Sequence, residues 1–363
     1  MVSVRQEAGL AMVRRGPEPR AACLADLGAS LGYSGALRSS PAAQKVSIMQ
    51  AQNMVDAASA LTARSYEYPI AKRLRFLVSY VLAKVLYLWR DVKTPRIRLF
   101  AYEVVYSFCR AAGRSPLPLR WLQLTQVSTI FGTFNIRIGT TDAACVSPAF
   151  ERQDLDLLLA RLSEHMAAGK AVLFIDVGAD VGTYAISVGN CLRALGDIRI
   201  LAFEPSKVSC DLLRLNVANN DLVDIVEPRQ IGLGDGSADS AELLFDAREP
   251  GCSGLDASIV QGEMVETVKM STLDAQLARH VLGSVIALKL DVEGSEIAVL
   301  KGAATTLAAA EEVLLLVEDF VDVGIVSYLE RTGWSFQEKV TPYNSLWILQ
   351  KHNPGRAKAR EEK

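Results

Sequence analysis

Histidines and closely spaced cysteines are scarce in this sequence, and both shortages restrict the chemistry that it can support. Its three histidines, His165, His280 and His352, are too far apart in sequence to predict a histidine metal cluster. None of its six cysteines forms a Cys-x-x-Cys pair, which argues against a zinc site and against a disulfide framework. The sequence therefore predicts no metal site of these kinds and a reducing, cytoplasmic compartment.

Long apolar runs and an excess of charge are also missing. No stretch of about 18 uncharged apolar residues occurs, so a membrane-spanning helix is not predicted. The N-terminal residues lack an apolar core followed by a cleavage site, so a signal peptide is not predicted. A formal net charge of −2 argues against a chain built to coat nucleic acid, and we expect no nucleic-acid partner.

Composition divides the 363 residues into four regions. Residues 1–45 are rich in Ala, Gly, Ser, Pro and Arg without periodicity, which predicts a disordered leader. Residues 46–115 contain apolar patterns of helical period and are expected to form a helical extension. Two prolines within residues 114–118 mark the boundary to the principal domain, 116–353, and residues 354–363 are expected to form a charged, frayed tail.

Residues 69–93 form the most regular part of this extension. Their spacing predicts an amphipathic helix, and eight Lys or Arg but one acid, Asp91, lie between Lys72 and Arg98. Because apolar helix faces are usually buried in protein, the pattern favours a helix that docks on the principal domain or on a second copy. A cationic helix with Tyr and Trp is also suited to an anionic membrane surface, so peripheral membrane contact stays open.

The principal domain is organised around residues 171–184, AVLFIDVGADVGTY. The apolar run predicts a buried parallel strand, and the glycines after it predict a tight turn that leads into a helix N-terminus. Such a junction in an open α/β sheet is where a nucleotide-like ligand binds. The residues expected to surround the ligand are Asp176, Gly178, Ala179, Asp180, Gly182 and Thr183.

Regular alternation of strands and helices follows. We expect strands at 171–177, 198–204, 225–233, 285–291 and 312–318, and helices at 182–195, 206–219, 272–281 and 296–310. This alternation predicts an α/β fold with a parallel sheet covered by helices on both faces. A hairpin at 127–141 and a helix at 147–170 precede it, and residues 236–270 are expected to insert a β-hairpin. Residues 333–351 predict two closely joined, antiparallel strands at the end of the sheet.

Acidic residues at the strand ends distinguish one nucleotide-like ligand from another. Glu204 ends the second strand, where a carboxylate accepts hydrogen bonds from both ribose hydroxyls. Carboxylates at Asp176 and Asp180 would repel a pyrophosphate but suit an amino acid and a sulfonium, which favours S-adenosylmethionine over NAD. Asp235, after the third strand, is placed to reach the adenine amino group, with an ordinary turn aspartate as the alternative.

Three further carboxylates are expected beside the methyl donor. Asp291 and Glu293 follow the fourth strand and Glu318 ends the fifth, at the edge where open α/β sheets keep their active sites. Asp291 is the first candidate for a base that accepts a hydroxyl proton, and Glu293 and Glu318 are the next. Oxygen ligands of this kind also suit Mg²⁺, but the sequence favours an active site without a metal.

These motifs resemble the FkbM family of S-adenosylmethionine-dependent O-methyltransferases. The resemblance covers about residues 125–350, and Asp180 and Ser295 depart from the residues common in that family. The segments that carry it are SPAFERQD (147–154), FIDVGADVGTYAIS (174–187), AFEPSK (202–207), GLGDGS (232–237), TLD (272–274) and LKLDVEGSEIAVLKGA (288–303).

The resemblance implies a Rossmann-like class I methyltransferase sheet with a terminal antiparallel hairpin, S-adenosylmethionine as cofactor, and methyl transfer to a hydroxyl of a sugar, glycan or polyketide-like acceptor. Two other functions stay open at this stage. One is a non-catalytic or membrane-surface module that keeps the fold, and the other is an RNA methyltransferase. We expect the 236–270 insertion and the N-terminal helices to select the acceptor, whose identity the motifs do not specify.

Overall fold

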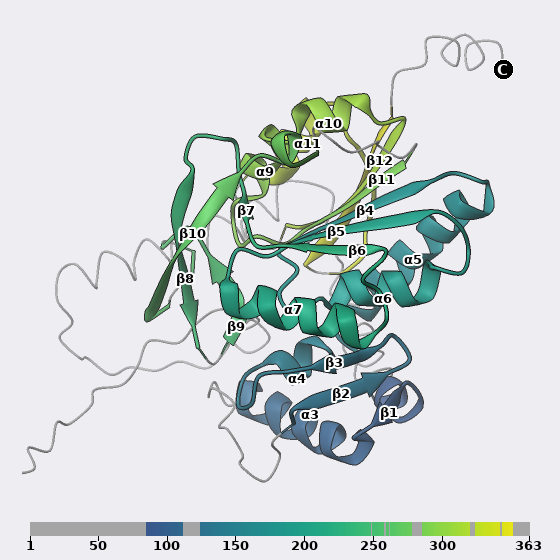
Figure 1. The fold of residues 1–363 in the computed structure, drawn as a ribbon, viewed down its shortest axis with the longest axis vertical. Helices are drawn as coiled ribbons and strands as arrows, with labels where there is room; N and C mark the ends of the chain where they lie inside the picture. Colours follow the sequence, from purple (N-terminus) through teal and green to yellow (C-terminus); the bar gives the residue numbers. More distant parts are fainter. Residues whose placement is uncertain are drawn as a thin grey trace, which may run out of the picture.

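The computed structural model describes residues 85–111, 124–247, 249–257, 259–260, 262–277, 285–319, 324–341 and 343–350. They form a seven-stranded sheet with helices on both faces and two smaller sheets beside it (Figure 1). The predicted leader, 1–45, and tail, 354–363, lie outside the described residues. Among the described residues, no helix is long and apolar enough to cross a membrane.

The seven-stranded sheet has the order β13-β14-β12-β11-β4-β5-β6. Five of its strands run parallel, and β14 lies antiparallel between β12 and β13, so the predicted terminal hairpin is confirmed. The bounds are β4 Val172–Val177, β5 Ile198–Phe203, β6 Val226–Arg229, β11 Val285–Leu290, β12 Glu312–Glu318, β13 Ser335–Lys339 and β14 Asn344–Gln350.

Strand β4 shows how the sequence produces two cores. All six of its residues are buried, as expected for a central parallel strand covered by helices on both faces. Because successive side chains of a strand point to opposite faces, Val172 and Phe174 pack on one side and Leu173 and Ile175 on the other. The helices of the first side are α5 Arg152–Ala167, α6 Thr183–Leu192 and α7 Lys207–Asn219. Those of the second are α8 Leu273–Leu277, α9 Glu296–Lys301, α10 Ala304–Ala309 and α11 Ile325–Arg331.

The register of the parallel strands decides where their ends meet. Val177, the last residue of β4, pairs with Leu290 of β11 on one side and with Phe203 of β5 on the other. The residues that follow these three strands, Gly178, Asp291 and Glu204, therefore emerge side by side at one edge. This edge is where open α/β sheets bind ligands.

A three-stranded antiparallel sheet precedes the large one. Its strands are β1 Val92–Thr94, β2 Gln126–Thr129 and β3 Thr133–Asn135, with helices α3 Arg96–Ala111 and α4 Asp142–Cys145. Strand β1 pairs with β2, so the described part of the N-terminal extension shares a sheet with residues beyond 115. Leu88, Val92 and Leu99 also pack in the same core as helix α5.

The second small sheet contains the predicted insertion. Its order is β7-β10-β8-β9, with bounds β7 Gly232–Leu233, β8 Ser240–Asp246, β9 Glu249–Gly254 and β10 Met264–Ser271. The prediction of a single hairpin over 236–270 was too simple, because a third strand, β10, pairs with both β8 and β7. This sheet stands at one end of the large sheet, next to helix α7 (Figure 1).

Two predicted elements are interrupted in the structure. The strand expected at 225–233 is split, since β6 ends at Arg229 on the large sheet and β7 begins at Gly232 on the small one. Pro228, which has no backbone donor, lies in β6 at the edge of the large sheet, where this loss is tolerated. The helix expected at 296–310 is two helices, because the backbone of Gly302 packs so closely on Gly234 that a Cβ would lie 2.0 Å from its carbonyl oxygen.

The helix predicted at 69–93 was also too long at its C-terminal end. Residues 85–90 are helical, Asp91 is a turn, and the following residues form strand β1. Pro95 explains this ending, because a residue that precedes proline is driven from the helical to the extended region. Residues 69–84 of that prediction lie outside the described residues. The helices predicted at 182–195 and 206–219 are confirmed as α6 and α7, while residues 278–284, at the end of the predicted 272–281 helix, are not described.

Candidate functional site

The loop after β4 is held by the neighbouring strand. The backbone N–H groups of Gly178 and Ala179 both donate to the carbonyl oxygen of Phe203, at 3.0 Å each. Gly178 has a left-handed backbone (φ 82°), and a Cβ on it would lie 1.9 Å from the carbonyl oxygen of Asp291. Asp180 is also left-handed (φ 44°). This glycine lets the loop lie directly against the end of β11.

Glu204 binds the same loop from the end of β5. Its Oε2 accepts the backbone N–H of Asp180 at 2.9 Å, and its Oε1 accepts that of Ser206 at 2.8 Å. Burial, reinforced by the negative charge of Asp180, raises the pKa of Glu204 to about 8 despite these hydrogen bonds. Each carboxylate oxygen keeps a second lone pair, so the group can still accept a hydrogen bond from a ligand.

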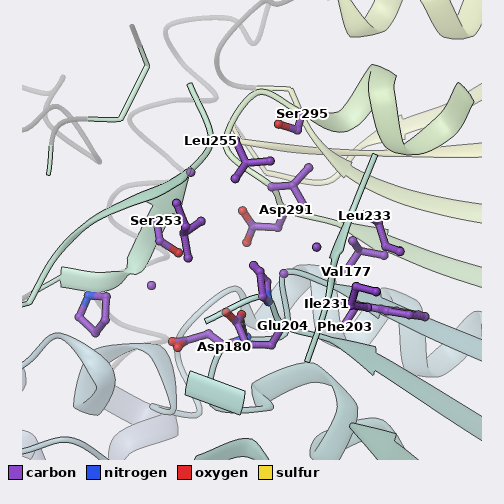
Figure 2. A pocket seen from close by; sticks show the side chains of 18 residues that line it. Val177, Asp180, Phe203, Glu204, Ile231, Leu233, Ser253, Leu255, Asp291 and Ser295 are labelled. Atoms are coloured by element: carbon purple, nitrogen blue, oxygen red, sulfur yellow. Dashed lines mark hydrogen bonds between the residues drawn. The ribbon is translucent and has the colours of Figure 1, made fainter. Parts of the chain in front are cut away.

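A pocket lies above these residues, at the carboxyl edge of the sheet. Figure 2 shows Asp180 and Glu204 on one side of it, Asp291 on another, and Ser253 and Leu255 facing them. Its apolar surface comes from Val177, Phe203, Ile231, Leu233 and Leu243, and its remaining lining from Gly178, Pro205, Gly232, Pro250, Gly251, Gly254, Val292 and Ser295. The pocket thus joins the ends of three parallel strands to the small sheet.

Strand β9 forms one wall of the pocket, and the sequence did not predict that it would lie there. Five of the six residues 250–255 line the pocket. The exception is Cys252, which is half-buried. Gly251 lies close to Asp180, since a Cβ on it would be 3.3 Å from Oδ2 of that residue. The Gly-rich segment was recognised in the sequence only as part of a hairpin, because nothing local indicates that it folds back over the loop after β4.

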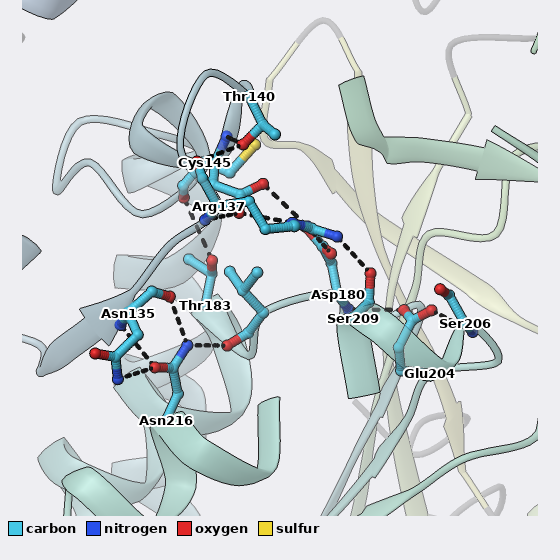
Figure 3. A network of polar contacts seen from close by, with 12 residues as sticks. Asn135, Arg137, Thr140, Cys145, Asp180, Thr183, Glu204, Ser206, Ser209 and Asn216 are labelled. Atoms are coloured by element: carbon cyan, nitrogen blue, oxygen red, sulfur yellow. Dashed lines mark hydrogen bonds and ion pairs between the residues drawn. The ribbon is translucent and has the colours of Figure 1, made fainter. Parts of the chain in front are cut away.

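Arg137 compensates the charge of Asp180, a pairing that the sequence did not indicate. Its guanidinium lies 2.6 Å from Oδ1 of Asp180 and 2.8 Å from Oδ2 of Asp142, and it donates to Oγ of Ser209 at 2.8 Å (Figure 3). Burial raises the pKa of Asp180, and the positive charge of Arg137 opposes this. The loop therefore faces a ligand with less negative charge than its two acids suggested.

Three other predicted cofactor residues support the loop from behind. Oδ2 of Asp176 accepts the backbone N–H of Ala185 at 3.0 Å, which fixes the first turn of helix α6. Gly182 is the residue before that helix, and Thr183 donates from Oγ1 to the carbonyl oxygen of Cys145 at 3.4 Å. Asp176, Ala179, Gly182 and Thr183 are absent from the described lining of the pocket. Their direct contact with a cofactor stays a prediction.

Asp235 lies away from the pocket. It is exposed, and its Oδ1 accepts the backbone N–H of Ser237 at 3.0 Å, a bond that lowers its pKa. This is the geometry of an aspartate that begins a turn. Contact of Asp235 with an adenine, like its alternative of an ordinary turn aspartate, stays a prediction.

Of the three predicted catalytic acids, Asp291 lines the pocket. Its Oδ2 lies 2.9 Å from Nζ of Lys289, a buried cation on β11. Burial raises the pKa of Asp291, but the charge and hydrogen bond of Lys289 outweigh it and hold the pKa below its ordinary value. Glu318 is the opposite case, because burial and the charges of Asp291 and Glu293 raise its pKa to about 11. Asp291 is thus a carboxylate at neutral pH, and Glu318 is a neutral acid bonded to it.

Glu293 completes this acidic group. It has a left-handed backbone (φ 50°), and one oxygen of each of Asp291, Glu293 and Glu318 lies within 4.8 Å of the others. Three oxygen donors at this spacing are of the kind that Mg²⁺ binds. One of them, however, is already paired with Lys289, which supplies a positive charge at the same place. The expectation of a site without a metal stays a prediction.

Lys289 was missed in the sequence because it lies within the apolar run of β11. Its Nζ is 4.8 Å from the centroid of the Tyr184 ring, whose hydroxyl donates to Oε2 of Glu151 at 2.8 Å. Burial lowers the pKa of Lys289, but the negative charges of Asp291, Asp176 and Glu151 outweigh this effect and raise the pKa above its ordinary value. The ammonium therefore stays protonated. The signal that could have identified it is a lysine within an otherwise apolar, buried strand.

The pocket fits an adenosyl group. Phe203, Ile231 and Leu233 offer apolar surface next to Glu204, whose free lone pairs suit ribose hydroxyls. Gly178 lets the loop pack against the end of β11, and Asp180 lies in the pocket lining, where it can meet a cationic group. The carboxylates and the apolar surface of the pocket therefore agree with the S-adenosylmethionine predicted from the sequence.

Comparison with known proteins finds similarity to the same family over part of the chain. Residues 176–330 match the family model described as the methyltransferase FkbM domain. Methyltransferase sdnD of Sordaria araneosa is 30% identical over a match that covers 35% of this chain and 59% of that protein, so the match spans about three fifths of this curated relative.

Among solved structures, two partial matches are to methyltransferases. Methyltransferase FkbM from Methylobacillus flagellatus KT has a TM-score of 0.34 and 14% identity over 49% of this chain and 43% of that one. Ribosomal protein L11 methylase from Lactobacillus delbrueckii subsp. bulgaricus has a TM-score of 0.31 and 18% identity over 53% of this chain and 78% of that one. Residues 176–330 of this chain are therefore similar to the methyltransferase FkbM domain.

Proposed function

We propose that this chain is an O-methyltransferase that moves the methyl group of S-adenosylmethionine to a hydroxyl group of a sugar, a glycan or a polyketide-like molecule. The observation that supports it most is the meeting of Glu204 and Asp291 in one pocket, from strands β5 and β11. One residue suits the ribose of the donor, and the other suits the hydroxyl of an acceptor.

The donor side of the pocket binds and orients. S-Adenosylmethionine, when bound, supplies a methyl group that its sulfonium has already activated. Glu204 would accept hydrogen bonds from the ribose, and Phe203 and Ile231 would cover the adenine. Arg137 keeps the Asp180 carboxylate in place at 2.6 Å, so the loop is arranged before the donor arrives.

The acceptor side contains the one pocket-lining carboxylate of the predicted catalytic set. Asp291 is ionised at neutral pH, so it can accept a hydrogen bond from an acceptor hydroxyl and fix the direction of its lone pair. Its low basicity does not prevent it from taking the proton, because a hydroxyl oxygen becomes strongly acidic as it bonds to a further carbon. Lys289 keeps Asp291 charged and oriented, and Glu318 bonds to it as a neutral acid.

Strand β9 is the part of the pocket best placed to contact the acceptor. Ser253 and Leu255 face Asp291 across the pocket (Figure 2). A hydroxyl and an apolar side chain beside a carboxylate suit an acceptor that has hydroxyl groups and some apolar surface. The 236–270 insertion was expected to take this role, and its position in the fold supports that proposal.

Methyl transfer from isotope-labelled S-adenosylmethionine to fractionated glycan and polyketide pools tests the function. Asp291→Asn should keep cofactor affinity within about threefold and reduce transfer at least about 100-fold, the lower range for a group that moves a proton. Asp224→Asn, in an exposed turn, is the matched control and should behave as the natural chain. Transfer to RNA alone, or cofactor binding without transfer to any hydroxyl pool, would contradict the proposed function.

A further inference from the structure

Helix α3 exposes a row of large apolar side chains. Ile97, Phe100 and Val104 recur at intervals of three and four residues, which places them on one face. Ile97 is 79% exposed, whereas Leu99 on the opposite face is fully buried in the core. Figure 1 shows α3 on the outer side of the three-stranded sheet, away from the seven-stranded sheet. The row therefore faces outward.

The helical residues 85–90 extend this row. Val85, Leu86 and Trp89 are exposed, and Trp89 is 66% exposed although it is the largest of the three. The guanidinium of Arg96, in the first turn of α3, lies 5.6 Å from the centroid of the Trp89 ring. This contact places Trp89 next to the start of α3. We call Leu86, Trp89, Ile97, Phe100 and Val104 together the α3 surface.

The charges around the α3 surface have one sign. Arg90, Lys93, Arg96 and Arg98 are the cations of residues 85–106, and none of them is buried. The acids of the same segment are Asp91 and Glu103, whose exposed fractions are 2% and 3%. Asp91 is buried against Arg152 at 2.6 Å and also pairs with Arg90, so Lys93, Arg96 and Arg98 supply the remaining positive charge. A ligand that approaches this segment thus meets apolar side chains and positive charge.

We propose that the α3 surface binds an anionic lipid membrane. Exposed Ile, Phe and Leu side chains would enter the boundary between headgroups and acyl chains, and the cations would contact anionic headgroups. Trp is the residue type that prefers this boundary. The sequence suggested membrane contact through 69–93, whereas the exposed side chains described here extend through α3, which the sequence had not indicated.

Charge favours a membrane over the other surfaces that could cover this row. Two copies joined by the same patch around a two-fold axis would bring their Arg and Lys side chains together, which opposes association. RNA would satisfy the cations, but it gives no reason for exposed Ile and Val side chains, which do not stack on bases. An anionic lipid surface matches both components.

Co-sedimentation of the full chain with vesicles tests this proposal. The chain should bind vesicles of phosphatidylcholine mixed with phosphatidylserine. Its affinity for vesicles of phosphatidylcholine alone should be at least about tenfold lower, since basic residues near an anionic surface add to the affinity. Ile97→Ser with Phe100→Ser, and separately Lys93→Glu with Arg98→Glu, should each reduce binding about tenfold or more. Val208→Ser with Val223→Ser is the matched control, because these side chains are 63% and 65% exposed elsewhere.

The outcomes separate the possible partners. Circular dichroism should show the same thermal unfolding for each double variant as for the natural chain, because all these side chains are exposed. The proposal is overturned if the chain ignores anionic vesicles, or if the α3 variants and the Val208/Val223 control lose binding equally. It is also overturned if light scattering shows a dimer that Ile97→Ser with Phe100→Ser dissociates, or if the α3 variants affect binding to RNA and not to lipid.

Discussion

Nζ of Lys289 lies 2.9 Å from Oδ2 of Asp291, and this pair joins a buried cation to the carboxylate that lines the pocket. The two residues are two positions apart at the end of β11, so their side chains leave the strand on the same side. The ring of Tyr184 covers the ammonium at 4.8 Å. Lys289 is thus positioned to keep Asp291 charged.

Lys289→Met should destabilise the fold by about 1–3 kcal/mol at pH 7, because it leaves the half-buried Asp291 carboxylate without its charged hydrogen-bond donor. In the natural chain the pKa of Asp291 is lower than in the unfolded chain. This difference stabilises the fold at pH values above the pKa of the unfolded chain, and the contribution is lost as the pH falls through the pKa of the folded chain. In the variant, burial is no longer opposed by Lys289, so the pKa of Asp291 rises. Urea unfolding should therefore show a larger difference between the two chains at pH 7 than at pH 4.

Lys289→Arg and Lys207→Met are the controls for this prediction. The arginine keeps a positive charge and should recover part of the stability. Lys207 is an exposed lysine on α7, where loss of a surface ion pair changes stability by at most about 1 kcal/mol. Equal stability of Lys289→Met and the natural chain at pH 7 would show that Asp291 does not depend on this cation.

Glu204→Gln should weaken the affinity for S-adenosylmethionine about 10- to 100-fold, since a hydrogen bond to a charged group contributes roughly 1.5–3 kcal/mol. The amide keeps one acceptor for the loop but loses the charge that ribose hydroxyls would meet. Isothermal titration calorimetry measures the change, and Asp224→Asn is again the control. An unchanged affinity would place the ribose elsewhere.

Binding of S-adenosylmethionine should release close to one proton at pH 7. The pKa of Glu204 is about 8 in the ligand-free chain, so this group is mostly protonated, and donors from a ribose would favour its ionised form. Affinity should rise with pH and level off above about pH 8. Calorimetry in buffers of different ionisation enthalpy measures the proton count. Release that persists in Glu204→Gln would assign it to another group.

Gly178→Ala should prevent cofactor binding and destabilise the chain, because its Cβ would meet the carbonyl oxygen of Asp291 at 1.9 Å. Gly169→Ala is the matched control. Gly169 has a similar φ of 75° but no atom within 4 Å of the added Cβ, so this variant shows the cost of backbone strain alone, about 1–2 kcal/mol. Thermal unfolding and calorimetry measure both. Equal behaviour of the two variants would remove the argument for close packing between the loop and β11.

The sequence predicted those features of the site that depend on neighbours along the chain. The strand at 171–177, the glycine turn after it and Glu204 at the end of the next strand follow from local patterns, and β4, β5 and the pocket confirm their arrangement. Register then places Asp291 beside them. The large sheet could be predicted because its strands alternate regularly with helices.

What the sequence did not predict depends on contacts between distant segments. Arg137 is 43 residues from Asp180, and no local pattern indicates their ion pair. The wall formed by Gly251 and Ser253 requires that β9 fold back over the pocket, which pairing within the small sheet determines. Asp235 was expected beside the adenine from its position after a strand; the chain leaves the large sheet at Arg229, before that residue, and the contact stays a prediction.

Calorimetric titration of the full chain with S-adenosylmethionine, and separately with NAD, tests the central claim most directly. The pocket formed by Glu204, Asp180 and the apolar side chains of Phe203 and Ile231 predicts saturable binding of one S-adenosylmethionine per chain. NAD should bind more weakly, because Asp180, although paired with Arg137, still places a carboxylate near its pyrophosphate. Binding of NAD without binding of S-adenosylmethionine would contradict the account.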